Sequence, residues 1–315
     1  MTVSKIVIAL GGNALQKKGE ASAESQVKVA AQTARQLVPL IAEGHQIVIV
    51  HGNGPQVGDI LLHEEAFNTV EAPTLPLDSC VAMSQGSIGY WLQQGLGNEL
   101  HANGSPMSVA SIVTQVLVDQ NDPAFQNPSK PIGPFYETEQ EARDAASARN
   151  FAIKEDSGRG WRRVVPSPLP KAIIEKSIIK TLIKDNYIVI AAGGGGVPVL
   201  ATDQGLKGVA AVIDKDMSAS VLADGIEAEI LLILTSVDAA KIHFGTPEEQ
   251  DLHEVSCEQM RKYCDAGEFA GGSMLPKVLA SLAFVERHRG HRKAIIASLD
   301  TVQAAMDGKS GTIIS

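Results

Sequence analysis

Three glycine-rich segments, each directly after a short apolar run, carry the clearest chemical signal in the sequence. They are Gly11-Gly12-Asn13, Gly52-Asn53-Gly54 and Gly193 to Gly196. Glycine lets the backbone approach a ligand closely and point N–H groups at it. Where such a turn leads directly into a helix, as after Gly54, the helix N-terminus also favours an anion. One such turn is more often a simple connection, but three turns at one sheet edge favour an anion-binding site.

Three lysines stand in settings that could bring positive charge to this edge. Lys130 lies in a proline-bracketed stretch, Lys215 follows an apolar run within Asp214-Lys215-Asp216, and Lys277 follows the turn Gly271-Gly272 where a helix begins. A single lysine is most often a solvated surface charge. Ammonium groups that converge on an anion would instead suit phosphoryl transfer, which depends on placement and on neutralising charge over the moving group.

Several common catalytic templates fail at a required position. The segment ending in Gly308-Lys309-Ser310 has Gln303 where a Walker A loop needs its first glycine. The dinucleotide fingerprint that starts at Gly52 ends on Val57, and the zinc-protease pattern that starts at His63 has Phe67 in place of its second histidine. We therefore assign no residue as a metal ligand.

The elements that must position these residues follow a repeated pattern of apolar run, glycine turn and helical periodicity. Uniformly apolar strands that alternate with helices predict an α/β protein with a mainly parallel sheet covered by helices on both faces. Ligands of such sheets bind at the carboxyl ends of the strands, where the glycine turns fall. Strands are predicted at 6–10, 47–50, 187–192, 230–234, 293–297 and 312–314, and helices at 24–43, after Pro55, at 172–184 and at 275–289.

One long segment, at about 118–170, interrupts the pattern with many prolines and mixed charges. A structureless loop of this length would be unusual inside a compact domain. We interpret it as a small excursion or subdomain that could cover the cleft.

Charge and composition exclude some classes of partner. The formal net charge is −9, which argues against nucleic acid or an anionic membrane surface. The three cysteines, Cys80, Cys257 and Cys264, have no CxxC spacing, which is typical of a reducing compartment. The apolar run 6–10 is too short for a signal peptide, and no stretch approaches the ~20 apolar residues of a membrane span. We expect a cytoplasmic protein.

Taken together and in order, these segments resemble carbamate kinases, which have the amino acid kinase fold. The resemblance runs from Ile6 to Ile314, and its most specific parts are the segment with Lys130 and the run Ile213-Asp214-Lys215-Asp216. The segments that match are 9–14, 51–58, 83–90, 127–136, 162–168, 193–198, 211–216, 272–278 and 311–313.

The resemblance implies an αβα sandwich with a small protruding subdomain at about 118–170. It implies an N-terminal lobe, residues 1–205, for carbamate or carbamoyl phosphate, and a C-terminal lobe, residues 206–315, for the nucleotide. Lys130 and Lys215 match lysines that stabilise the transferred group, Asp214 matches the carboxylate that orients lysines, and Lys277 matches a contact to the nucleotide phosphates. The implied substrate contacts are Gly11, Gly12, Asn13, Gly52, Asn53 and Gly54, and the implied nucleotide contacts are Gly194, Gly195, Thr235, Ser236, Gly272, Ser273, Met274 and Lys277.

The resemblance also implies ATP or ADP and Mg²⁺ as cofactors and a homodimer as the working form. Lys241, His243 and Ser236 depart from the family pattern beside the nucleotide, which leaves nucleotide preference open. Two alternatives remain: a kinase of the same fold for another small carboxylate, and a non-catalytic sensor of nucleotide or carbamoyl phosphate. The presence of all three lysines argues against a sensor.

Overall fold

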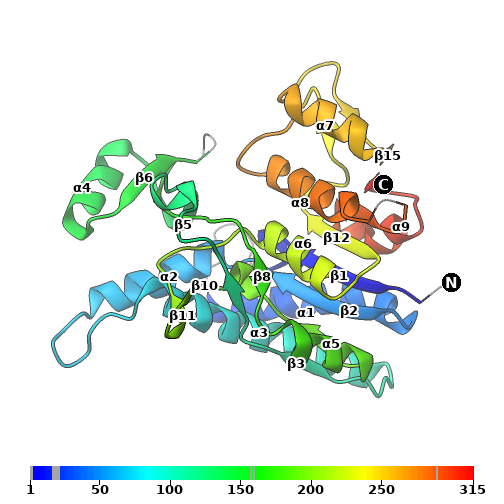
Figure 1. Ribbon diagram of the computed structural model, residues 1–315, viewed down its shortest axis with the longest axis horizontal. Helices are drawn as coiled ribbons and strands as arrows, with labels where there is room; N and C mark the ends of the chain where they lie inside the picture. The colour runs from blue at the N-terminus through cyan, green and yellow to red at the C-terminus, as the bar shows by residue number, and fades with distance from the viewer. Residues whose placement is uncertain (1–2, 16–21, 157, 159, 289) are drawn as a thin grey trace.

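The computed structural model describes residues 3–15, 22–156, 158, 160–288 and 290–315, and within them an eight-stranded sheet forms the centre (Figure 1). All neighbouring strands in this sheet are parallel except β16 and β17, which are antiparallel. The predicted fold class is therefore confirmed. In spatial order the strands are β15 (Glu254–Val255), β17 (Thr312–Ile314), β16 (Lys293–Ser298), β12 (Ile230–Thr235), β1 (Lys5–Leu10), β2 (Gln46–His51), β9 (Ile188–Ile190) and β3 (Val109–Ser111).

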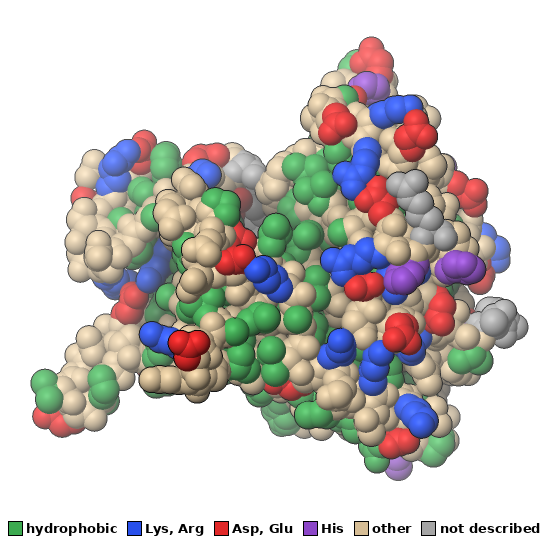
Figure 2. Space-filling view, viewed as in Figure 1, with side chains coloured by type: hydrophobic (Ala, Val, Ile, Leu, Met, Phe, Trp, Pro, Cys, Tyr) green, Lys and Arg blue, Asp and Glu red, His purple; other side chains and the backbone are tan. Residues whose placement is uncertain are grey.

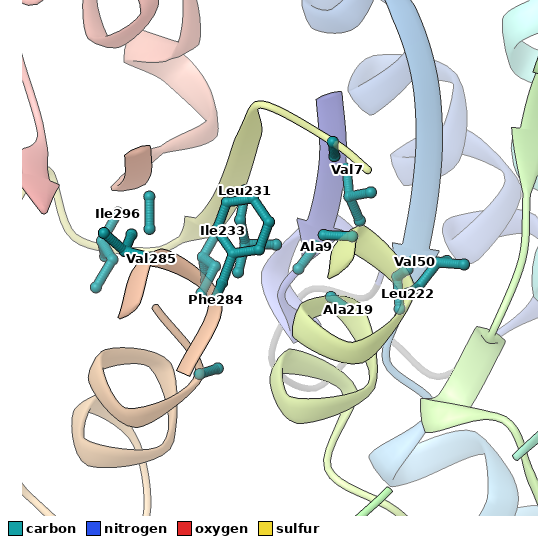
Figure 3. Close-up of a cluster of buried hydrophobic side chains, with 14 of the residues drawn as sticks. Val7, Ala9, Val50, Ala219, Leu222, Leu231, Ile233, Phe284, Val285 and Ile296 are labelled. Carbon is teal, nitrogen blue, oxygen red and sulfur yellow. The ribbon is translucent and has the colours of Figure 1, made fainter. Parts of the chain in front are cut away.

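Both faces of this sheet are buried because its strands are apolar at successive positions. In β1, Val7 and Ala9 point into one core, whereas Ile6, Ile8 and Leu10 point into the other. Figure 3 shows the first core, where side chains of α6 and α8 meet the sheet. Helices α5 (Lys176–Lys184), α6 (Lys215–Gly225), α7 (Cys257–Asp265) and α8 (Met274–Glu286) contribute to that core, and α1 (Ala23–Ala42), α3 (Leu77–Ala102) and α9 (Val302–Met306) contribute to the opposite one.

Local signals at several chain positions explain where helices begin. The Ser22 hydroxyl accepts a hydrogen bond from the backbone N–H of Ser25 and caps α1. Pro55 lies in the first turn of α2 (Gly54–Ala66), where its missing N–H costs nothing. None of the helices in the described part of the chain has the length and apolar content that crossing a membrane requires.

A second sheet has four strands, and one of them includes residues that were predicted to be helical. Its strands, in spatial order, are β11 (Gly205–Gly208), β10 (Val197–Thr202), β4 (Gln115–Leu117) and β8 (Ala172–Ile173). The helix predicted from 172 begins only at Lys176, because Ala172 and Ile173 pair with β4. The helix predicted for 275–289 ends at Glu286, and residue 289 lies outside the described residues.

The segment predicted to be an excursion contains a small folded unit that stands away from the main body (Figure 1). It has an antiparallel sheet in which β7 (Trp161–Val165) lies between β5 (Lys130–Tyr136) and β6 (Ala152–Glu155). Helix α4 (Glu139–Arg149) begins at a capping box formed by Thr138 and Glu141. We call residues 130–165 the protruding subdomain. Its first strand carries Lys130 toward the main body.

Candidate active site

A cavity of about 220 Å³ lies at the carboxyl edge of the main sheet, where the predicted site segments meet. The turn after β2, the turn after β9 and the N-termini of α6 and α8 all line it, together with Lys130 from the protruding subdomain. The space-filling view shows the molecule hollowed between the protruding subdomain and the part that carries α7 (Figure 2). The predicted residues that line the cavity are Gly12, Gly52, Asn53, Gly54, Lys130, Gly194, Asp214, Lys215, Gly272, Ser273 and Lys277.

Asp214 joins the protruding subdomain to the start of α6. One carboxylate oxygen, Oδ2, accepts a hydrogen bond from Lys130 Nζ at 2.6 Å. The other, Oδ1, caps α6 by accepting from the backbone N–H groups of Asp216 and Met217. Burial alone would raise the pKa of the Asp214 carboxyl, but the Lys130 ammonium, helped by Lys215 and Lys277, holds that pKa well below its usual range.

Asp216 connects the other two lysines directly. Its Oδ1 lies 2.5 Å from Lys215 Nζ, and its Oδ2 lies 3.0 Å from Lys277 Nζ. The three side chains are 3%, 12% and 14% exposed for Asp216, Lys215 and Lys277, so this cluster is largely shielded from water. Burial lowers the pKa of the Lys215 ammonium, and the ion pair with Asp216 opposes that shift.

Sequence reasoning missed the role of Asp216. It assigned the orientation of lysines to Asp214, which contacts Lys130 directly, whereas Asp216 makes the direct ion pairs with Lys215 and Lys277. The sequence Asp214-Lys215-Asp216 was the available signal that both acids could pair with lysines. It did not say which acid would become the helix cap and which would turn inward in the first turn of α6.

The glycine turns bring the backbone close to the lysines. The Gly52 N–H donates to Leu10 O at 3.3 Å, and a Cβ added at Gly52 would lie 3.3 Å from Lys215 Cδ. Gly194 has φ of +65°, and a Cβ there would overlap the Asn53 side chain. A Cβ at Gly12 or Gly54 would meet no described atom within 4 Å. At those two positions the absence of a side chain leaves room at the cavity for a ligand.

Two asparagines were also predicted to bind substrate. Asn53 is buried, and its Nδ2 donates to Ser84 Oγ at 2.8 Å. Asn13 lies in the short 3-10 turn after β1, and its side chain lies outside what the structure describes.

A larger cavity of about 660 Å³ shares Gly12, Lys215 and Lys277 with the smaller one. Its lining includes Gly11, Thr235 and Ser236, so the predicted substrate and nucleotide residues border two neighbouring cavities that share lining residues. The remaining two predicted nucleotide residues lie beside them: the buried Gly195 accepts a hydrogen bond from Ser218 Oγ at 2.6 Å, and Met274 is the first residue of α8.

Of the residues that depart from the family pattern, Ser236 follows β12 and lines the larger cavity, whereas Lys241 and His243 lie in or beside a short hairpin formed by β13 (Lys241–Ile242) and β14 (Gln250–Asp251). Lys241 Nζ makes ion pairs with Glu249 at 2.7 Å and Asp251 at 3.0 Å. The backbone N–H of His243 donates to Glu268 Oε2 at 2.8 Å. The Lys241 ammonium is therefore paired within the hairpin.

Comparisons with known proteins point to one family along nearly the whole chain. Residues 4–298 match the model of the amino acid kinase family. A carbamate kinase of Pyrococcus furiosus is 52% identical over 98% of this chain and 98% of its own length, and carbamate kinase 1 of Enterococcus faecium is 49% identical over 99% of both. The solved structure of carbamate kinase from Giardia lamblia bound to citric acid has a TM-score of 0.93 at 43% identity, and covers 99% of this chain and 98% of that one. The same enzyme bound to AMP-PNP has a TM-score of 0.90, with the same identity and coverage. This chain belongs to the amino acid kinase family.

Proposed function

We propose that the chain acts as a carbamate kinase, which transfers a phosphoryl group reversibly between ATP and carbamate to give ADP and carbamoyl phosphate. The observation that carries the proposal is the placement of Lys130, Lys215 and Lys277 around one glycine-lined cavity. Relatives named carbamate kinase, about half identical over the whole chain, support the same activity.

The geometry suits phosphoryl transfer to an acceptor that is already an anion. Carbamate needs no strong general base, so the protein has only to hold the reactants in line and to stabilise charge on the moving group. In this proposal Lys130 and Lys215 stabilise that group, and Lys277 contacts the nucleotide phosphates. Asp214 and Asp216 hold the ammonium groups in position before the substrates bind.

Glycine turns supply the rest of the proposed cradle; Gly11 and Gly52 contribute close backbone approach, because their N–H groups already donate to Leu234 O at 3.0 Å and Leu10 O at 3.3 Å. Gly11, Gly12, Gly52 and Gly54, with Asn13 and Asn53, would contact carbamate or the transferred group. Gly194, Gly195, Thr235, Ser236, Gly272, Ser273 and Met274 would flank the nucleotide. The corresponding division is an N-terminal lobe, residues 1–205, for carbamate and a C-terminal lobe, residues 206–315, for the nucleotide.

Mg²⁺ is proposed as the second cofactor. The described residues contain no cluster of three or more His, Cys, Asp or Glu that could hold a metal ion, and Asp214 and Asp216 already contact lysines. Mg²⁺ bound to nucleotides takes most of its ligands from phosphates and water. This chain therefore fits a cation that arrives with the nucleotide, where it would neutralise phosphate charge.

The test is a coupled assay that measures ATP formed from ADP and carbamoyl phosphate. Strong turnover supports the proposal, because carbamoyl phosphate then serves as the phosphoryl donor. Turnover only with another acyl phosphate would identify a kinase of the same fold for a different small carboxylate. Tight binding of nucleotide or carbamoyl phosphate without turnover would identify a sensor. Either of the last two results would overturn the proposal.

We also propose that the chain forms a homodimer. Met83 and Tyr90 expose 43% and 56% of their surface on α3, and Phe67 and Val70 are still more exposed just beyond α2. Exposed apolar side chains of this kind are common at subunit interfaces. Sedimentation at micromolar concentration would test this, and a monomer would refute it.

The proposed cellular role is ATP formation from carbamoyl phosphate in arginine or other nitrogen catabolism, in the cytoplasm. The thiols of Cys80, Cys257 and Cys264 suit a reducing compartment.

A further inference from the structure

The protruding subdomain rests on α2 through a contact between two backbones. Gly58 of α2 and Gly133 of β5 are both buried, and a Cβ added at Gly58 would lie 2.0 Å from Gly133 N and 2.1 Å from Gly133 Cα. Real side chains do not approach backbone atoms so closely, because ordinary van der Waals contact begins at about 3.4 Å. The two elements can meet here only if position 58 has no side chain.

Two arginines of β7 fix the contact on either side. Arg162 donates from Nε and Nη2 to Gly133 O, at 3.1 and 2.7 Å, and so holds the β5 backbone at this point. Arg163 Nη1 makes a 2.7 Å ion pair with Glu65 Oε1, near the end of α2. The subdomain therefore meets α2 at the Gly58–Gly133 contact, which Arg162 supports from within the subdomain, and at the Arg163–Glu65 ion pair.

The same two elements carry both halves of the phosphate site. Helix α2 begins at Gly54, in the turn that lines the cavity, and β5 begins at Lys130. Gly58 lies about one helical turn after Gly54, and Gly133 lies three residues after Lys130. The Gly58–Gly133 contact thus sets the separation between the glycine cradle and the Lys130 ammonium.

We propose that Gly58 is a positioning residue that acts through Lys130, an inference that rests on the proposed function. A methyl group at position 58 forces α2 and β5 apart by more than about 1 Å before ordinary contact is restored. The 2.6 Å contact between Lys130 and Asp214 is then lost, and Lys130 moves away from the phosphoryl group. Misplacement of about 1 Å can reduce turnover about 100-fold.

The experiment compares Gly58→Ala with Gly97→Ala in the ATP-forming assay. Both glycines are inside helices, where alanine is intrinsically favoured, but a Cβ at Gly97 meets no described atom within 4 Å. We expect Gly58→Ala to lose about 10- to 100-fold in kcat with an unchanged KM for ADP, and Gly97→Ala to keep wild-type values.

A double-mutant cycle with Lys130→Ala separates positioning from general damage. If Gly58 acts through Lys130, Gly58→Ala causes little further loss once Lys130 is absent. A loss of equal size in both backgrounds would overturn the proposal, as would wild-type kcat in Gly58→Ala.

If Gly58→Ala does not fold, a second variant can test whether the contact between α2 and the protruding subdomain positions Lys130. Glu65→Gln keeps the side-chain shape and removes the charge that pairs with Arg163. We expect a smaller loss of kcat, which again disappears in the Lys130→Ala background. If Glu65→Gln lowers kcat as much in the Lys130→Ala background as it does in the wild type, the proposal is overturned.

A measurement that does not depend on catalytic activity separates the test of this inference from the test of the proposed function. The rate of Lys130 acetylation by acetic anhydride, followed by mass spectrometry, reports whether its ammonium is held by Asp214. We expect faster modification in Gly58→Ala and a wild-type rate in Gly97→Ala. Equal rates in all three proteins would refute the positioning role, whereas an inactive wild type with the expected rates would refute only the proposed function.

Discussion

Replacement of Asp216 by asparagine removes a charge that contacts both Lys215 and Lys277. The side chain keeps its shape, but the ammonium groups of two lysines whose side chains are 12% and 14% exposed lose their shared carboxylate. Breaking a buried ion pair by removing one partner costs about 3–5 kcal/mol, because the remaining charge is left uncompensated. A typical protein has only about 5–15 kcal/mol of stability. We expect the free energy of unfolding of Asp216→Asn to be lower than that of the wild type by about 3 kcal/mol at pH 7.

The pH dependence of this variant has a definite sign. Burial already lowers the pKa of Lys215 below 10.5, and Asp216 opposes that shift. Without the carboxylate the pKa falls further, so the ammonium is lost at a lower pH than in the wild type. The alkaline limb of the activity profile therefore moves to lower pH. The stability deficit is largest at neutral pH and shrinks as pH rises through the lowered pKa, because the buried charge is then removed.

Two measurements check these expectations. Urea unfolding, followed by tryptophan fluorescence, gives the free energy at several pH values, and the ATP-forming assay gives the alkaline limb. The matched control is Asp224→Asn on the same helix, which loses contacts to Arg287 and Arg292 but lies outside both cavities' described linings. The control should lose stability without any shift of the alkaline limb. An Asp216→Asn protein with wild-type stability and a wild-type alkaline limb would refute the reasoning.

Three further predictions follow from the site. Lys130→Ala should lower kcat far more than it weakens ADP binding, because Lys130 reaches the cavity only from the protruding subdomain; equal kcat in steady-state kinetics would remove its role. Burial lowers the pKa of His51 to about 4, so the folded state resists protonation and stability falls as pH drops from 6.5 toward 4, by up to about 3 kcal/mol. In urea unfolding, the free energy of unfolding of His51→Gln should no longer fall over this pH range, whereas the control His101→Gln, at an exposed site, should keep the fall. An unchanged slope of the free energy against pH in His51→Gln would contradict the assignment of the pH dependence to His51. EDTA should abolish turnover, and Mg²⁺ should restore it, without any change in the urea midpoint of the free protein; a lowered midpoint would indicate a metal held by the chain itself.

Sequence patterns predicted the centre of the fold well. The strands at 47–50 and 230–234 are uniformly apolar, and they form β2 and β12 inside the main sheet. The helix predicted from 172 was wrong at its start, because Ala172 and Ile173 are apolar at a spacing that suits either structure. Pairing with β4, a tertiary interaction, decides between them.

The longest helix, α3, was not predicted. Its glycines dilute the apolar periodicity, yet two of them serve packing. A Cβ at Gly89 would overlap the Ser111 side chain, and one at Gly95 would lie 3.2 Å from Ala31 Cα in α1. Glycine selected for close approach thus weakens the pattern that sequence reasoning depends on.

In the site, sequence and resemblance identified the segments but not all of their contacts. The three lysines were named, and the structure brings them to one cavity; their catalytic roles stay a prediction. The direct partners of Lys215 and Lys277 could not be read from Asp214-Lys215-Asp216. They depend on where α6 begins, since Asp214 caps the helix and Asp216 lies within its first turn.

The position of β1 has a consequence for how the protein is made. Its residues 5–10 pair on one side with β2, which is synthesised soon afterwards, and on the other with β12 at 230–235. One edge of this very apolar strand therefore stays without its partner until most of the chain has left the ribosome. Unpaired apolar edges are sites of aggregation. Nascent chains of this protein should therefore depend on chaperone protection until β12 emerges and completes the middle of the sheet.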